Sequence, residues 1–151
     1  MATFADNRKA HFDYEILEKL QAGLVLNGQE VKSIKSGRIQ LAGSYVLLRE
    51  KELFLVGANI PPYQPANAPK DYDPERSRKL LLHKDEIQDI LGKVKEKGLT
   101  LIPLRVYNNK RQLKLEFALA KGKKKGDKRE AIKLREAKRE IERTLKRGYT
   151  D

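Results

Sequence analysis

The densest group of side chains that could do chemistry lies near the C-terminus. Residues 121–151 contain thirteen Lys and Arg against six Asp and Glu, and so supply +7 of the formal net charge of +12. Cations of this kind neutralise phosphates, and the release of condensed counterions then drives binding to a polyanion. The segment has too little apolar surface for a core of its own. We therefore predict that residues 122–151 are a basic tail, disordered in the free protein and helical when bound.

A second group of cations lies in the run Arg76-Ser77-Arg78-Lys79-Leu80-Leu81-Leu82-His83. Guanidinium groups present paired donors to phosphate oxygens. We predict a phosphate clamp, in which Arg76, Arg78 and Lys79 face RNA while the leucines mostly enter the core. The alternative is a solvated loop that only contributes its leucines to the core.

Two further basic features are weaker indications of RNA binding. Residues 29–36 have the spacing of a short helix, on which Lys32 and Lys35 share a face and Glu30 precedes them. A lysine stripe of this kind usually serves only to keep the protein soluble. An acidic residue among lysines can also orient them or accept hydrogen bonds from bases. Lys110 lies at the basic tip of a predicted hairpin, and we include it among the candidate RNA-binding residues.

Residue types that would support catalysis are sparse. The two histidines, His11 and His83, lie far apart in the sequence, and the chain has no Cys. No glycine-rich phosphate loop follows a predicted strand, and the pair Asp71 and Asp73 is typical of a turn. We therefore expect no catalytic residue, no metal and no cofactor.

Length and composition set the remaining bounds. The 151 residues fit one domain, residues 1–121, followed by the basic tail. A chain without Cys fits a reducing cytoplasm, and we expect neither a secretory signal nor a membrane-spanning segment. The basic excess favours nucleic acid over an acidic protein or a membrane surface.

The pattern of the body predicts mainly strands. Apolar residues alternate with polar ones from Phe12 to Leu26, and two hairpins are predicted, at 44–58 and 99–120. A proline-rich irregular segment at 61–69 precedes a long helix, whose apolar spacing begins at Leu80 and which ends near Gly98. The sum is a mainly β fold: about six antiparallel strands in a closed barrel of the oligonucleotide-binding type, with flanking helices.

Several ordered blocks together resemble the small protein B family, the bacterial partners of transfer-messenger RNA. They include Asp13-Tyr14-Glu15-Ile16, Gly28-Gln29-Glu30-Val31-Lys32-Ser33, the run from Asp73 to His83, Ala120-Lys121-Gly122-Lys123-Lys124 and Asp127-Lys128-Arg129. The resemblance runs from about Asn7 to near the C-terminus. It implies an oligonucleotide-binding-like barrel and a non-enzymatic adaptor. Such an adaptor binds the tRNA-like domain of transfer-messenger RNA, supports its alanylation and delivers it to stalled ribosomes.

The resemblance also implies roles for single residues. In the body it implies RNA contacts for Leu81 and His83, with Glu30 and Lys32 nearby. In the tail it implies contacts with the vacant decoding centre and the mRNA channel of the ribosome for Gly122, Lys123, Lys124, Asp127, Lys128, Arg129, Ile132 and Leu145. Alanyl-tRNA synthetase and elongation factor Tu are the implied indirect partners. The chain departs from the family pattern at Gln21, Asn108 and Gly126.

Other functions remain open at this point. A ribosomal or ribosome-assembly protein of the same fold would bind rRNA permanently. An RNA-processing enzyme would need acid–base or metal-binding groups that the sequence lacks. A helical module that binds a protein would pair the tail with another helix, and its binding would be insensitive to salt.

Overall fold

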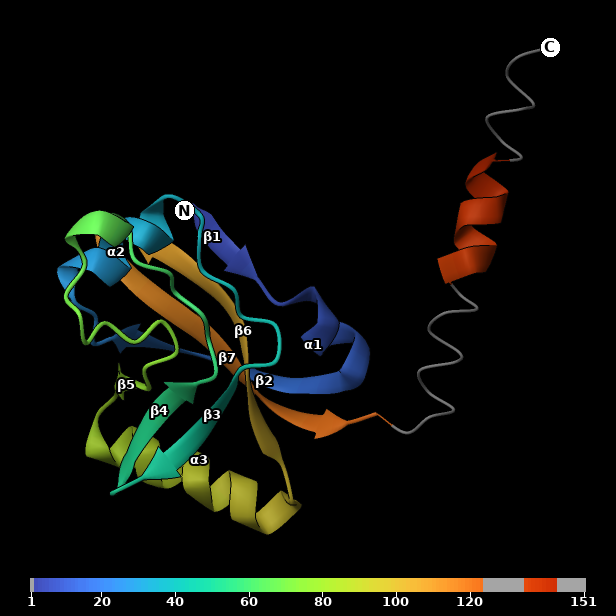
Figure 1. Ribbon diagram of the computed structural model, residues 1–151. Helices are drawn as coiled ribbons and strands as arrows, with labels where there is room; N and C mark the ends of the chain where they lie inside the picture. The colour runs from blue at the N-terminus through green and yellow to red at the C-terminus, as the bar shows by residue number, and fades with distance from the viewer. Residues whose placement is uncertain (1, 124–134, 144–151) are drawn as a thin grey trace. The chain divides into compact units, whose positions relative to one another are not determined.

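A single seven-stranded sheet organises most of the chain (Figure 1). The computed structural model describes residues 2–123 and 135–143, and the chain divides into two units, Met1–Lys121 and Gly122–Asp151. The strands are β1 (Thr3–Asp6), β2 (Tyr14–Leu24), β3 (Tyr45–Arg49), β4 (Glu52–Val56), β5 (Arg78–Leu81), β6 (Thr100–Asn109) and β7 (Gln112–Gly122). The helices are α1 (Arg8–Asp13), α2 (Gly28–Lys35), the 3₁₀ turn η1 (Pro65–Asn67) and α3 (Lys84–Lys97).

The strand order is β1-β6-β7-β2-β5-β4-β3. The registered pairs β1–β6, β6–β7, β2–β5, β5–β4 and β4–β3 are antiparallel. The mainly β, antiparallel prediction is therefore confirmed, with seven strands instead of about six. The predicted closure is not confirmed. Within the described residues, β3 and β6 approach each other but are not hydrogen-bonded neighbours, so the sheet curls and stays open between its end strands β1 and β3.

Both predicted hairpins are present, and both use a two-residue turn. Glu50 and Lys51 connect β3 to β4 with φ of 50° and 67°, and Lys110 and Arg111 connect β6 to β7 with φ of 48° and 70°. Two successive positive φ values are the geometry of a type I′ turn, whose twist matches that of the flanking strands. The second turn therefore projects two basic side chains from the end of the longest hairpin.

The core lies on one face of the curled sheet and includes one residue from α2 and two from α3. Leu53, Leu80 and Phe117 are fully buried there, together with Ile34 of α2, and Ile87 and Ile90 of α3 are nearly so. A smaller cluster on the other side packs Ala10 of α1 against Ile102, Leu104, Ala118 and Ala120. In Figure 1, α2 and α3 lie near opposite ends of the strands.

Three elements differ from the sequence prediction. The strand expected from Phe12 begins at Tyr14, because Arg8–Asp13 forms α1. The short strand β1 was not predicted. The helix whose spacing began at Leu80 starts only at Lys84, because Arg78–Leu81 forms β5 and pairs with both β2 and β4. A run of three leucines has no periodicity that separates a buried strand from a helix.

The second unit contains a helix at 135–143, and the side chains of these residues are exposed. Within the described residues, no helix is long and apolar enough to cross a membrane.

Candidate nucleic-acid interface

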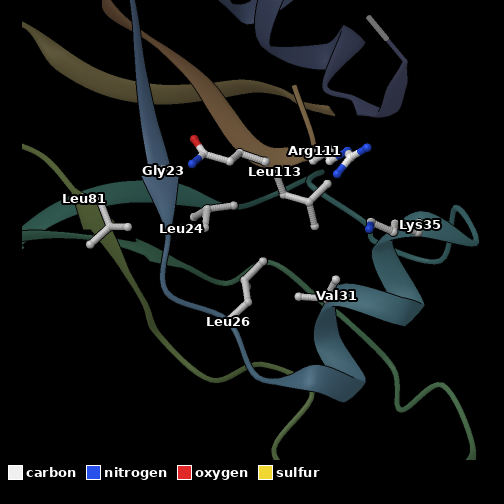
Figure 2. A pocket seen from close by; sticks show the side chains of 9 residues that line it. Gly23, Leu24, Leu26, Val31, Lys35, Leu81, Arg111 and Leu113 are labelled. Carbon is white, nitrogen blue, oxygen red and sulfur yellow. The ribbon is translucent and has the colours of Figure 1, made fainter. Parts of the chain in front are cut away.

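A hollow of about 300 Å³ lies where β2, α2, β5 and the β6–β7 hairpin meet (Figure 2). Three separate parts of the chain supply its walls. It is lined by Gly23, Leu24, Leu26, Val31, Lys35, Leu81, Arg111, Gln112 and Leu113. Its floor is apolar, and the cations of Lys35 and Arg111 lie on one side of it in Figure 2. Such a site combines contact area for a sugar or base with charge for phosphates.

Leu81 is the most unusual residue of this hollow. Its side chain is 56% exposed, whereas the preceding Leu80 is fully buried. Strand alternation explains the difference, because successive side chains point to opposite faces of a sheet. Leu81 pairs with Gly23, and a Cβ at Gly23 would lie 3.2 Å from Leu81 Cδ1. The missing side chain of Gly23 therefore gives Leu81 the space in which it lies.

Cations lie beside this apolar patch. Lys32 and Lys35 are exposed on α2, and Lys110 and Arg111 are exposed at the hairpin tip. Within the described residues, none of the four forms a salt bridge to a carboxylate. Their charges are therefore not neutralised by a carboxylate of the described residues, and RNA binding by Lys32, Lys35 and Lys110 stays a prediction.

A second hollow, of about 510 Å³, adjoins the first at Gly23 and Leu81. Gln21, His83, Glu86 and Lys114 contribute its polar side chains. The backbone N–H of His83 donates to Glu86 Oε1 at 3.1 Å, which caps α3 and leaves the exposed imidazole outside that bond. Leu81 and His83, which the resemblance paired, are thus brought to one surface.

Beneath α2 the structure places a buried charge network centred on Glu30. Its carboxylate accepts hydrogen bonds from Arg76 Nη2 at 2.5 Å, Arg78 Nε at 2.6 Å and the backbone N–H of Asn27 at 3.0 Å. Burial raises the pKa of Glu30, but these hydrogen bonds outweigh it and the pKa is lowered. Glu30 is therefore a carboxylate at neutral pH, and it fixes the first turn of α2 against β5.

Arg78 uses its remaining donors on the backbone. Nη1 donates to the carbonyl of Ala58 at 2.7 Å, and Nη2 donates to the carbonyl of Pro74 at 2.9 Å. The side chains of Arg78 and Glu30 are both 0% exposed. The predictions that Arg78 and Glu30 contact RNA directly are therefore wrong for this structure. An isolated buried charge is costly, and the two ions are buried because each satisfies the other.

The other cations of the 76–83 run are only partly free to reach RNA. Arg76 is 40% exposed and is bound to Glu30 and to the carbonyl of Val25. Lys79 is 44% exposed, with Nζ 3.7 Å from Glu52 Oε1. The predicted phosphate clamp is therefore divided, because its central guanidinium lies in the core and its flanking cations lie at the surface.

Comparison with known protein families finds one whose sequence model matches this chain. The model of the family described as SmpB protein matches residues 4–147. The chain belongs to the SmpB protein family. An SsrA-binding protein of Sulfurihydrogenibium sp. (strain YO3AOP1) is 54% identical over 142 residues, which cover 94% of this chain and 93% of the relative. One from Cupriavidus necator is 50% identical over 149 residues, 99% of each chain.

A solved structure agrees with this membership in the SmpB family. The structure, described as "tmRNA-SmpB: a journey to the center of the bacterial ribosome", is 45% identical to this chain with a TM-score of 0.66. The match covers 85% of this chain and 93% of the other.

The predicted basic tail begins at the end of β7. Gly122 ends β7, and Lys123 follows it. The remaining predicted tail residues lie outside the described part of the chain: Lys124, Asp127, Lys128, Arg129, Ile132 and Leu145.

Sequence reasoning on this SmpB-family chain missed Gly23, Arg111 and Lys114, all of which line the two hollows. Arg111 had a signal, because it follows Lys110 at the hairpin tip. Gly23 and Lys114 are set by strand register, which a single sequence does not display. Within the described residues, no group of three His, Cys, Asp or Glu side chains could hold a metal ion.

Proposed function

We propose that this chain is an RNA-binding adaptor of trans-translation. It binds the tRNA-like domain of transfer-messenger RNA, supports its alanylation and delivers it to stalled ribosomes. Membership in the SmpB family supports this proposal, because its relatives are named SsrA-binding proteins and the similar solved structure concerns tmRNA-SmpB and the ribosome. The adaptor performs no chemical step itself. Its contribution is binding and orientation.

The observation that carries the proposal is exposed Leu81 on one side of a hollow whose other side carries the cations of Lys35 and Arg111 (Figure 2). An apolar side chain at the surface of a strand offers contact to a base or a ribose that has left its stack. Lys35 and Arg111, which line the same hollow, supply charge for neighbouring phosphates. Shape and apolar contact would thus select the RNA, and the cations would add affinity that depends on salt.

The tail has a separate role in this proposal. Lys123, Lys124, Asp127, Lys128 and Arg129 read the vacant decoding centre, and Ile132 and Leu145 support a helix that forms in the mRNA channel. Alanyl-tRNA synthetase and elongation factor Tu act on the RNA that the body holds. The whole complex works in the cytoplasm.

The deciding experiment measures binding of the full-length protein and of residues 1–121 to transfer-messenger RNA and to an ordinary tRNA, over a series of salt concentrations. We expect both forms to bind transfer-messenger RNA more tightly than tRNA. Equal binding of the two RNAs would exclude the adaptor. Loss of binding on truncation would mean that RNA binding depends on non-specific electrostatic contacts of the tail.

A second experiment separates the tail from the body. The double variant Lys128→Ala/Arg129→Ala should keep nearly the full affinity for transfer-messenger RNA and abolish peptide tagging on stalled ribosomes. A large loss of affinity would contradict this division of roles.

A further inference from the structure

On the side of α2 opposite the hollow, hydrogen bonds hold the backbone of an aromatic residue in place. Tyr63 lies in the irregular proline-rich segment between β4 and β5 and is 36% exposed. The backbone N–H groups of Tyr63 and Gln64 both donate to Gln29 Oε1, at 2.9 and 3.2 Å. Gln29 belongs to α2, so the helix holds this loop through one side-chain amide. In Figure 1 the green segment that carries η1 lies next to α2.

A second bond fixes the carbonyl side of the same residue. Gly37, with φ of 78°, adopts the left-handed conformation just after the end of α2. Arg38 follows it, and its Nη1 donates to the carbonyl of Tyr63 at 3.2 Å. The guanidinium carbon of Arg38 also lies 5.7 Å from the centroid of the Tyr63 ring. Both the N–H and the C=O of Tyr63 are therefore held, although Tyr63 itself lies outside any helix or strand.

Helical spacing relates this ring to the proposed RNA surface. With 100° per residue, Gln29 and Lys35 lie on opposite flanks of α2, and Lys32 projects between them. Lys35 lines the hollow that contains Leu81, and Gln29 holds the loop of Tyr63. The exposed lysines of α2 therefore form a ridge with an apolar hollow on one side and an aromatic ring on the other.

We propose that Tyr63 is a stacking platform for an unpaired nucleobase of the bound RNA. Bases that leave a helix stack on aromatic and guanidinium planes, and such contacts tolerate any base because each has a π-face. A residue whose backbone is already held loses less conformational entropy when a base covers its ring. This inference rests on the proposed function and adds a second contact to it, beyond the hollow around Leu81.

The first test compares Tyr63→Phe with Tyr63→Leu in the full-length protein, with the tRNA-like fragment of transfer-messenger RNA as ligand. Stacking needs the ring and not the hydroxyl. We expect the Phe variant to bind within about twofold of the wild type and the Leu variant to bind about tenfold more weakly. The salt dependence should be equal in all three proteins, because no phosphate contact is removed.

The second test uses the absence of tryptophan from the chain. Tyr63→Trp would introduce a unique fluorophore, whose emission a stacked base quenches. Tyr45→Trp is the matched control, since Tyr45 is 45% exposed on β3 and lines neither hollow beside Leu81. We expect RNA to quench the Tyr63→Trp emission and to leave the control emission unchanged.

The outcomes separate this inference from the proposed function. If the wild type prefers transfer-messenger RNA over tRNA, but Tyr63→Leu binds equally well and Tyr63→Trp is not quenched, the stacking proposal is overturned and the proposed function stands. If the wild type shows no such preference, the proposed function fails. Quenching of Tyr63→Trp by a short single-stranded RNA then still decides whether the ring stacks on bases.

Discussion

Two groups of cations lie on either side of α2, and their surroundings are opposite. Beneath the helix, Arg78 is fully buried and all its observed bonds go to Glu30 and to backbone carbonyls. On the outside, Lys35 and Arg111 line an open hollow and have no carboxylate partner within the described residues. The inner group holds α2 in place, and this position of α2 brings Lys35 to the hollow where it can bind phosphates beside Arg111. The contrast shows that a cation's role depends on which side of an element it occupies.

The largest effect is expected where the inner group is broken. Arg78→Ala leaves the Glu30 carboxylate buried without its fully buried partner, and removal of one member of a buried ion pair costs about 3–5 kcal/mol. Urea unfolding would measure this loss. Lys35→Ala is the control and should change the stability by less than about 0.5 kcal/mol. Similar losses for the two variants would remove the contrast.

A smaller effect with a characteristic pH dependence is expected for Glu30→Gln. The pKa of Glu30 is lower in the folded than in the unfolded chain, so its ionised form stabilises the protein above the unfolded pKa of about 4.5. As the pH falls from there through the folded pKa, this contribution is lost. Wild type and variant should therefore differ by about 2 kcal/mol at pH 7.

Below about pH 4.5 this difference in the free energy of unfolding should shrink, because the wild type also becomes neutral at Glu30. Urea titrations at pH 7, 5 and 3.5 would measure it. A difference that stays constant over this range would show that the charge of Glu30 does not matter.

The outer group is tested by Lys35→Ala/Arg111→Ala. We expect affinity for transfer-messenger RNA to fall about tenfold, and the slope of log K against log salt to decrease by about one unit for each phosphate contact removed. Stability should be nearly unchanged. Glu50→Ala/Lys51→Ala, at the other hairpin tip, serves as a control. If it weakened RNA binding equally, the effect could not be assigned to the hollow.

The smallest effect is expected for Gly23→Ala. Its added Cβ would lie 3.2 Å from Leu81 Cδ1, so the exposed leucine must shift by a few tenths of an ångström. Because Leu81 faces solvent, the cost in stability should stay below about 1 kcal/mol. The affinity for RNA should still fall a few-fold. Unchanged affinity would mean that the position of Leu81 is not critical.

The sequence predicted the features that depend on local pattern. Both hairpins, the short helix and the proline-rich segment follow from alternation, spacing and turn residues. The resemblance predicted the family. The burial of Arg78 could not be predicted, because it depends on Glu30 lying forty-eight positions away in the sequence. An arginine that faces a phosphate and one that faces a buried carboxylate have the same local sequence signal.

Strand β5 and the hollow beside it were missed for a related reason. Leu80, Leu81 and Leu82 differ in exposure although they are identical in type. Their environments are set by pairing with β2 and β4, which come from distant segments. Tyr63 likewise gave no signal, since the residues that fix it lie on α2 and just beyond it.

The two hairpin turns suggest that the protein gives up some thermal stability for RNA binding. Each has non-glycine residues at both left-handed positions, a conformation that costs an L-residue roughly 1–2 kcal/mol. The variant Lys51→Gly should therefore have a higher melting temperature and unchanged RNA binding. The variant Arg111→Gly should also have a higher melting temperature, but a lower affinity for RNA. At the turn beside the proposed RNA surface, Arg111 would then lower the stability of the fold, because its charged side chain is needed for binding.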